Sequence, residues 1–308
     1  MLPTTNGEVF IIKTSDRNAG VKSLLSKFDL SEFGGKHVAL KANFNSADPF
    51  PASTHLDTLR AVVENLKKAN AADLTLGERS GKGNTRQVLE RMGVFVLSEK
   101  LGFNAVVLDE IAKEEWLKIE RDGTHWLKGF YIAKLFAEAD KVVQTCCLKV
   151  HRFGGHFTLS LKNSVGIVAK KVPGTIYDYM WELHGSPYQR MMIAEINKYY
   201  KVDLIIMNGI KAFVDGGPER GKEVQPDLLL ASKDRVAIDA VGVAVLRSYG
   251  STSHIMNGNI FDLDQIRRAA ELGVGISSAS EIRLTPLNSA SHEAADKIAE
   301  MLEREAKD

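Results

Sequence analysis

Residues 146–163 concentrate the side chains of this sequence that could do chemistry. The segment reads CCLKVHRFGGHFTLSLKN, so Lys149, His151 and Lys162 place two ammonium groups and an imidazole around a Gly-Gly turn. Ammonium groups can hold a carboxylate or a phosphate, and an imidazole with its ordinary pKa of about 6.5 can transfer protons at neutral pH. We therefore expect these three residues to be catalytic, with the lysines positioning an anion and His151 acting as general acid or base.

Polar and glycine-rich segments that follow other apolar runs are candidates for the same site. The expected substrate-binding residues are Lys41, Asn43, Asn45, Glu78, Ser80, Ser160, Asn163, Asn208, Gly216 and Gly217. Residues 77–85 form a glycine-rich loop before a helix, a geometry that can cradle phosphate, although the order GxxxxGK[ST] is absent. Residues 214–221 are either a backbone nest for an oxyanion or an ordinary hairpin turn. Asparagines in such loops also commonly pin the loop itself.

A metal- or cofactor-binding accessory protein is the alternative interpretation. His151, His156 and His184 could hold a divalent metal if they converge, although their spacing matches no standard zinc motif. The two cysteines are adjacent, at 146 and 147, and no CxxC motif is present. The sequence therefore excludes a self-contained iron–sulfur cluster and leaves the cofactor unknown.

Composition narrows the class of protein. The 308 residues carry 40 basic and 39 acidic side chains, a formal net charge of +1, so no global field would recruit nucleic acid or a membrane surface. No apolar run approaches the length of a membrane helix, and the N-terminus lacks the pattern of a signal peptide. Two adjacent cysteines fit a reducing compartment. We expect a cytoplasmic protein whose partner is a small anionic metabolite, and the composition is compatible with a homo-oligomer.

Short β-rich runs alternate with helical patterns along the chain. The expected strands are 9–13, 37–41, 73–77, 104–108, 141–148, 203–207 and 227–231. Residues 207–209 are expected to end the sixth of these strands. Apolar spacing predicts helices over 54–68 and 234–249, and a closing amphipathic helix over 289–308. This alternation predicts an α/β fold with a largely parallel, helix-covered sheet.

Two lobes are the expected domain organisation. The boundary is placed at residue 140, giving an N-terminal α/β lobe over 1–140 and a C-terminal α/β lobe over 141–308, with the site between them. Segment 110–129 is charged, and we expect it to form an excursion, a stretch that leaves the main fold between the two halves. Asp239 lies one turn inside an apolar helix, and because an unpaired buried carboxylate is unfavourable, we expect it to be tied to a lysine.

The polar segments resemble, in order and over about residues 37–275, the family called domain of unknown function 362 (DUF362). The resemblance rests on Lys41-x-Asn43, Gly77-Glu78-x-Ser80-Gly81, Lys149-x-His151 with Ser160-Leu-Lys162-Asn163-x-x-Gly166, Gly216-Gly217-Pro218 and Ser232-x-Asp234-x-Val236-Ala237-x-Asp239. The block around Lys149 and Lys162 is the specific part.

The resemblance implies no established reaction, and it nominates these loops as parts of one site. Many relatives resemble iron–sulfur proteins through a cysteine-rich, ferredoxin-like segment, which this chain lacks, so an electron-transfer role is not carried over. More loosely, the architecture looks like the nickel-pincer lactate racemase group. From the residues we expect an enzyme of isomerase or lyase type, because proton transfer next to a carboxylate needs these parts and no nucleophilic triad is evident.

Overall fold

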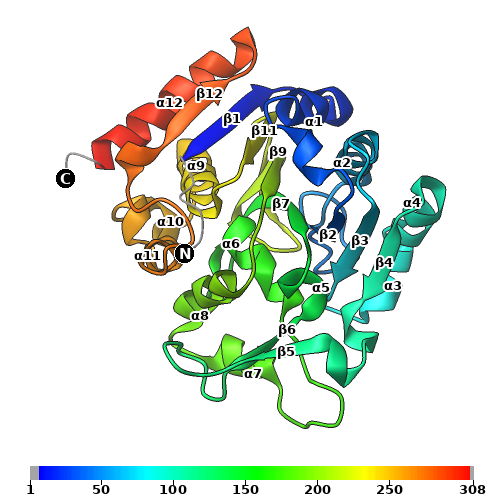
Figure 1. Cartoon of the computed structure of the whole chain (residues 1–308). Coiled ribbons are helices and arrows are strands. Elements are labelled where there is room, and N and C mark those ends of the chain that lie inside the picture. The colour runs from blue at the N-terminus through cyan, green and yellow to red at the C-terminus, as the bar shows by residue number, and fades with distance from the viewer. Residues whose placement is uncertain (1–6, 306–308) are drawn as a thin grey trace.

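The computed structural model describes residues 7–305, whose centre is one ten-stranded sheet with helices on both faces (Figure 1). Its strands are β1 (Glu8–Lys13), β2 (His37–Lys41), β3 (Asp73–Glu78), β4 (Asn104–Val107), β7 (Lys141–His151), β8 (His156–Thr158), β9 (Leu204–Gly216), β10 (Gly221–Val224), β11 (Leu228–Ser232) and β12 (Arg283–Pro286). A separate hairpin pairs β5 (Trp116–Ile119) with β6 (Phe130–Ala133).

The helices connect and cover these strands. They are α1 (Arg17–Leu25), α2 (Leu56–Lys68), α3 (Thr85–Arg91), α4 (Val94–Leu101), α5 (Lys134–Ala137), α6 (Ser160–Asn163), α7 (Tyr179–Gly185), α8 (Gln189–Ile196), α9 (Arg235–Ser248), α10 (Ser253–Met256), α11 (Asp264–Glu271) and α12 (Ser289–Glu305). None of the helices within residues 7–305 has both the length and the apolar character needed to cross a membrane.

The sheet has the order β12-β1-β11-β9-β7-β2-β3-β4, with β8 added to β7 and β10 added to β9. The five strands from β9 to β4 are parallel neighbours, so their carboxyl ends meet at one edge. Strand β11 is antiparallel to both β9 and β1. The predicted α/β class with a largely parallel sheet is confirmed.

Both faces of the sheet are buried. Val9 and Ile11 of β1 enter one apolar core, together with residues of α8, α9 and α12, whereas Phe10 and Ile12 enter another with α1, α2 and α4. Successive side chains of a strand point to opposite faces, and a sheet covered on both faces therefore needs apolar residues at every position. This explains why the strands read as unbroken apolar runs.

All seven predicted strands are present, and two of them extend at least three residues beyond their expected ends. β7 continues to His151, and β9 continues to Gly216, so the prediction that residues 207–209 close a strand is wrong. The extension of β9 pairs with β10 in an antiparallel hairpin, which supplies the hydrogen bonds that keep it extended. The three predicted helices appear as α2, α9 and α12, the last described as far as Glu305.

The sheet runs without interruption through both halves of the chain. β1 lies between β11 and β12, and β2 lies next to β7 (Figure 1). Segment 110–129, expected to be an excursion, contains β5 and leads into β6. The boundary expected at residue 140 thus falls immediately before β7, in the middle of the sheet.

Candidate functional site

A cavity of about 550 Å³ opens beside the carboxyl ends of β2, β3 and β7, and we call it the central cavity. Nine of the sequence-predicted candidates line it: Lys41, Asn43, Asn45, Glu78, Lys149, His151, Lys162, Asn163 and His184. They come from both halves of the chain. Parallel strands bring their carboxyl ends together, which is why residues distant in sequence converge here.

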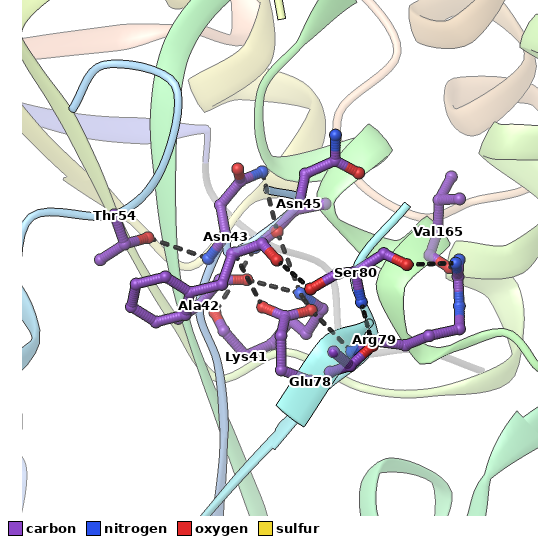
Figure 2. Close-up of polar contacts among 12 residues, drawn as sticks. Lys41, Ala42, Asn43, Asn45, Thr54, Glu78, Arg79, Ser80 and Val165 are labelled. Carbon is purple, nitrogen blue, oxygen red and sulfur yellow. Dashed lines mark hydrogen bonds and ion pairs between the residues drawn. The ribbon is translucent and has the colours of Figure 1, made fainter. Parts of the chain in front are cut away.

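Lys41 and Glu78 form a buried ion pair at the floor of the cavity, with Nζ 2.7 Å from Oε1 (Figure 2). Lys41 also donates to the Ala42 carbonyl and, at 3.4 Å, to Oδ1 of Asn163. Glu78 accepts from the backbone N–H groups of Phe44 and Arg79 at 3.1 and 3.0 Å. Burial lowers the pKa of Lys41, and Glu78 opposes that shift. All three ammonium hydrogens have partners, so this pair holds the ends of β2 and β3 together.

Lys149 is fully buried and is held by oxygen atoms of amide groups. Its Nζ lies 3.2 Å from Oδ1 of Asn43 and also donates to the Ala52 carbonyl. No carboxylate of the described residues lies within ion-pair distance of it, and burial lowers its pKa. Asn43 in turn lies 3.5 Å from Oδ1 of Asn163. The hydrogen bonds found within residues 7–305 use two of the three ammonium hydrogens of Lys149.

Lys162 differs from the other two lysines because no hydrogen bond or ion pair to its ammonium group is found among residues 7–305. Its side chain is only 9% exposed. Burial, reinforced by the positive charges of Lys149 and Arg79, lowers the pKa of Lys162 to about 7. A lysine with this pKa is present as both amine and ammonium near neutral pH.

The short helix α6 carries Lys162, and Asp239 of α9 fixes the start of that helix. The Asp239 carboxylate accepts hydrogen bonds from the backbone N–H groups of Ser160 and Leu161, at 2.7 and 2.9 Å. The prediction that Asp239 is tied to a lysine is therefore wrong. Backbone amides at the start of a helix are unpaired donors, so they can take the place of a lysine. They offset the burial only in part, because burial still raises the pKa of Asp239 to about 8.

His151 and Thr158 each bury a polar atom without a partner in the described part of the chain, Nδ1 and Oγ1 respectively. Both residues line the central cavity. Burial, with the charges of Lys162 and Lys149, lowers the pKa of His151 well below its ordinary value. His151 is therefore a neutral imidazole at physiological pH.

Arg79 is a site residue that the sequence reasoning missed. Its guanidinium is buried and donates to the carbonyls of Val165 and Val168, at 2.6 and 2.8 Å, so that it ties the end of β3 to the segment after α6 (Figure 2 shows the contact with Val165). Burial lowers its pKa, and nearby acids oppose the shift. Its place in the Gly77–Gly81 loop was the only signal in the sequence.

The walls of the cavity are strongly cationic. They contain six basic residues, Lys41, Arg79, Lys82, Lys149, Lys162 and Lys170, and three acids, Glu78, Asp178 and Glu219. The acids already have partners: Glu78 pairs with Lys41, and Glu219 pairs with Arg152 and lies 4.0 Å from Lys82. Asp178 accepts from two backbone N–H groups at the start of α7. The positive charge that remains favours an anion.

Apolar side chains complete the wall. Phe44, Val165 and Met180 are buried there, whereas Phe153 and Trp181 are exposed, the latter by 81%. Lys82 and Phe153 lie in the segments 77–85 and 146–163 that the sequence singled out, but they were not named as candidates, and no motif marked Asp178 or Trp181.

Five predicted substrate-binding residues and one candidate metal ligand do not line the central cavity: Ser80, Ser160, Asn208, Gly216, Gly217 and His156. Their polar groups serve the fold instead. Ser80 donates to the Phe44 carbonyl at 2.6 Å, and Ser160 donates to Gln144 at 2.7 Å. Asn208 donates to Thr58 at 2.8 Å.

The glycines form the β9–β10 hairpin, in which Gly216 pairs with Gly221, so the hairpin interpretation of residues 214–221 is the one observed. The carbonyl of Gly217 accepts a hydrogen bond from Arg152. This hairpin places Pro218 and Glu219 in the cavity wall.

The three candidate metal ligands do not form one group. His151 and His184 line the cavity, but His156 stacks on His254 with ring centroids 4.3 Å apart. Within residues 7–305, no three side chains of the types His, Cys, Asp and Glu are placed to hold a metal ion. Cys146 and Cys147 are free, buried thiols, and burial raises the pKa of both.

Comparison with known proteins gives a family and a distant structural likeness. The family model described as "Domain of unknown function (DUF362)" matches residues 38–244, which is more than half of the chain. No curated protein matches the sequence. Among solved structures, the chain is similar to the lactate racemase apoprotein from Thermoanaerobacterium thermosaccharolyticum, with 19% identity and a TM-score of 0.45. That match covers 66% of this chain and 50% of the other, so this chain spans about half the length of that protein.

Proposed function

Because this chain belongs to the DUF362 family, whose description names no reaction, we propose a function from the site itself: an enzyme that binds a small carboxylate- or phosphate-bearing metabolite and transfers a proton on it. The observation that carries the proposal is Lys162, a buried lysine that faces a cationic cavity and has no partner among the described residues. A bound anion would supply the missing negative charge. The volume of about 550 Å³ suits a small metabolite.

Lys149 and Lys162 have different roles in the proposed reaction. Lys149, held by Asn43, presents its remaining ammonium hydrogen to the anionic group. Lys162 then exchanges a proton with the substrate, because a pKa of about 7 matches a group that must both gain and lose a proton at neutral pH. His151, expected from the sequence to be the general acid or base, is neutral and offers a hydrogen bond instead. Isomerisation or elimination next to a carboxylate needs only these parts.

Lys41 and Glu78 act as positioning residues in this scheme. Their ion pair holds the ends of β2 and β3, and Lys41 also reaches Asn163, the neighbour of Lys162 on α6. Neither has a free donor for the substrate.

The same features support proposals about the protein's setting. Six basic residues converge inside the cavity and the net charge of the sequence is only +1, which favours a small anion over nucleic acid as the ligand. Two free, buried cysteines favour a reducing compartment, so we place the protein in the cytoplasm, as a monomer or a homo-oligomer.

Isothermal titration calorimetry with malonate, lactate, inorganic phosphate and glycerol phosphate tests the proposal. At least one of these anions should bind, and Lys149→Met and Lys162→Met should each weaken its binding by about 10- to 100-fold, the effect of one charged hydrogen bond. Lys171→Met is the matched control, since Lys171 is exposed and does not line the cavity.

Melting curves separate binding from folding. Lys162→Met should melt no lower than the wild type at pH 7, because the buried ammonium it removes has no partner in the described structure. If none of the four anions binds, or if both variants bind as tightly as the control, the proposed function is wrong.

A further inference from the structure

The amino group of Lys162 has the features of a nucleophile as well as those of a proton carrier. A lysine reacts through the lone pair of its neutral amine, and burial next to other cations is a recognised way to keep that amine unprotonated. Lys162 is 9% exposed, lines a cavity large enough for a substrate, and is flanked by Lys149 and Arg79. No acceptor in residues 7–305 engages its Nζ, so the amine is available to react.

Two polar groups without partners among residues 7–305 line the same cavity as this amine. A Cβ atom added to Gly155 would lie 2.6 Å from Cε of Lys162 and 3.3 Å from Nδ1 of His151, so the end of the lysine and the imidazole pack against the same glycine. Nδ1 of His151 and Oγ1 of Thr158 are buried without partners and belong to the same cavity wall. Both atoms can hydrogen-bond the substrate oxygen and its hydroxyl group while an amine adds to a carbonyl group.

We propose that Lys162 forms a covalent imine with the carbonyl carbon of an anionic substrate, an inference that rests on the proposed function. The Nζ lone pair attacks the carbonyl carbon, a C–N bond forms, and the C=O π bond breaks. The proton lost by nitrogen passes to the oxygen, giving a carbinolamine. That hydroxyl then takes a proton from solvent and leaves as water while the nitrogen lone pair forms the C=N bond. This step gives the iminium ion, and loss of its N–H proton gives the imine. No oxidant or reductant is consumed.

The surroundings define the substrate class. Lys149, whose ammonium uses two of its three hydrogens within residues 7–305, would hold a carboxylate or phosphate while the carbonyl carbon reaches Lys162. The substrate is therefore a small aldehyde or ketone that carries an anionic group, such as a 2-oxo acid or a phosphorylated aldehyde. An iminium ion withdraws electrons from the adjacent carbon, which would ease loss of a proton there and so serve an isomerase or a lyase.

Reductive trapping tests the inference on the full chain. The protein is incubated with pyruvate, glyoxylate or glycolaldehyde phosphate and sodium cyanoborohydride, and peptide mass spectrometry then locates any adduct. We expect a mass increase equal to the probe less one oxygen atom, on Lys162, from at least one probe. Acetone, which has the carbonyl group but no anion, should give less than a tenth of that adduct. The oxo acids and the phosphorylated aldehyde distinguish a carboxylate from a phosphate as the anion.

Lys162→Arg and Lys171→Arg are the matched variants. Lys162→Arg keeps the positive charge but cannot form an imine, so it should lose the adduct, whereas Lys171→Arg should keep it. A calorimetric titration with the same probes separates the two proposals: binding without an adduct on Lys162 would overturn the imine alone, and absence of both binding and adduct would overturn the anion site as well. An equal yield from Lys162→Arg and the wild type would also refute the inference.

Discussion

At the scale of residues, the three buried lysines of the central cavity differ in the number of partners of their ammonium groups. Lys41 donates three hydrogen bonds, one of them to Glu78, and Lys149 donates two, both to amide oxygens. Lys162 donates none within the described residues. A buried ammonium group needs hydrogen-bond or ion-pair partners to remain charged without a large loss of stability. Within residues 7–305, Lys41, Lys149 and Lys162 have three, two and no such partners, so we expect their roles to range from structural to reactive.

Anion binding should be linked to proton uptake by Lys162. Its pKa of about 7 in the free protein is lowered by burial and by Lys149 and Arg79, and a bound anion would raise that pKa. Affinity should therefore be highest below about pH 7 and fall above it, by as much as about tenfold per pH unit. Titrations with malonate in buffers of different ionisation enthalpy should show net proton uptake between about pH 7 and pH 9.

The control for this prediction is Lys162→Arg, which keeps a permanent charge at that position. The other groups around Lys162 are Lys149, Arg79 and the two imidazoles of His151 and His184, whose pKa values are lowered as well. If the arginine variant binds malonate and takes up as many protons as the wild type, one of these neighbours, and not Lys162, is the titrating group.

Residue types and spacing were enough to nominate nine of the 23 residues that line the central cavity, but not the contacts among them. Lys149, His151 and Lys162 could be found because they crowd one segment behind an apolar strand. Their partners could not, because a hydrogen bond such as that from Lys149 to Asn43 joins positions 106 residues apart. The sequence also gave no means to separate Lys162, which lacks a partner, from Lys41, which pairs with Glu78.

At the scale of elements, the short helix α6 depends on a neighbour for its position. Four residues are too few for a helix to be stable alone, and Asp239 of α9 supplies acceptors for its first two N–H groups. The same helix carries Lys162 and Asn163 into the cavity. Burial of Asp239 could be predicted from the apolar pattern of α9, but its partners lie nearly 80 residues away and left no local signal.

Asp239→Asn should therefore loosen α6. The amide nitrogen of asparagine cannot accept a hydrogen bond, so one buried N–H of Ser160 or Leu161 loses its partner. We expect a loss of about 1–3 kcal/mol in the free energy of unfolding, measured by urea denaturation. Anion binding should weaken too, since Lys162 moves with the helix. Asp262→Asn, at an exposed position, is the control, and an unchanged unfolding midpoint for Asp239→Asn would contradict the assigned role.

The turn after α6 must carry glycine at 166. A Cβ atom there would lie 2.7 Å from Nζ of Lys41 and 2.8 Å from Oε1 of Glu78. Because three hydrogen bonds hold that ammonium group, neither partner can move aside freely. Gly166→Ala should destabilise the protein by about 1–3 kcal/mol, as overpacking of a filled site does.

Gly185→Ala is the matched control, because apart from its own helix and chain neighbours no atom of residues 7–305 lies within 4 Å of where its Cβ would be. In thermal melts, Gly166→Ala should therefore have a lower melting temperature than Gly185→Ala. Equal melting temperatures would show that the Lys41–Glu78 pair is free to shift.

Element prediction from the sequence worked where strands are apolar and failed where they are short and partly exposed. The central strands are covered on both faces, so their residues had to be apolar and their positions were evident. β10 has only exposed or half-buried residues, and β8 has three residues in all. Such strands are held by their neighbours β9 and β7, and tertiary pairing of this kind leaves no pattern in the strand itself.

At the scale of the whole molecule, the sheet and the cavity both combine the two halves of the chain. Both neighbours of β1, which are β11 and β12, come from the second half, and β2 pairs along its length with β7. The cavity takes Lys41 and Glu78 from the first half and Lys149 and Lys162 from the second. Because strands from before and after residue 140 pair with each other, neither half alone can supply all the backbone hydrogen bonds that its strands need.

Fragments 1–140 and 141–308, expressed separately, should therefore fail to fold, whereas co-expression should restore a complex that melts cooperatively. In fragment 1–140, β1 would have no partner strand, and β2 would expose the edge that β7 covers. Unpaired buried backbone groups are too unfavourable for a stable domain. Amide proton dispersion in NMR spectra checks this. A well-dispersed, cooperatively melting fragment 1–140 would contradict it and would support two lobes divided at residue 140, because a lobe is defined by folding without the rest of the chain.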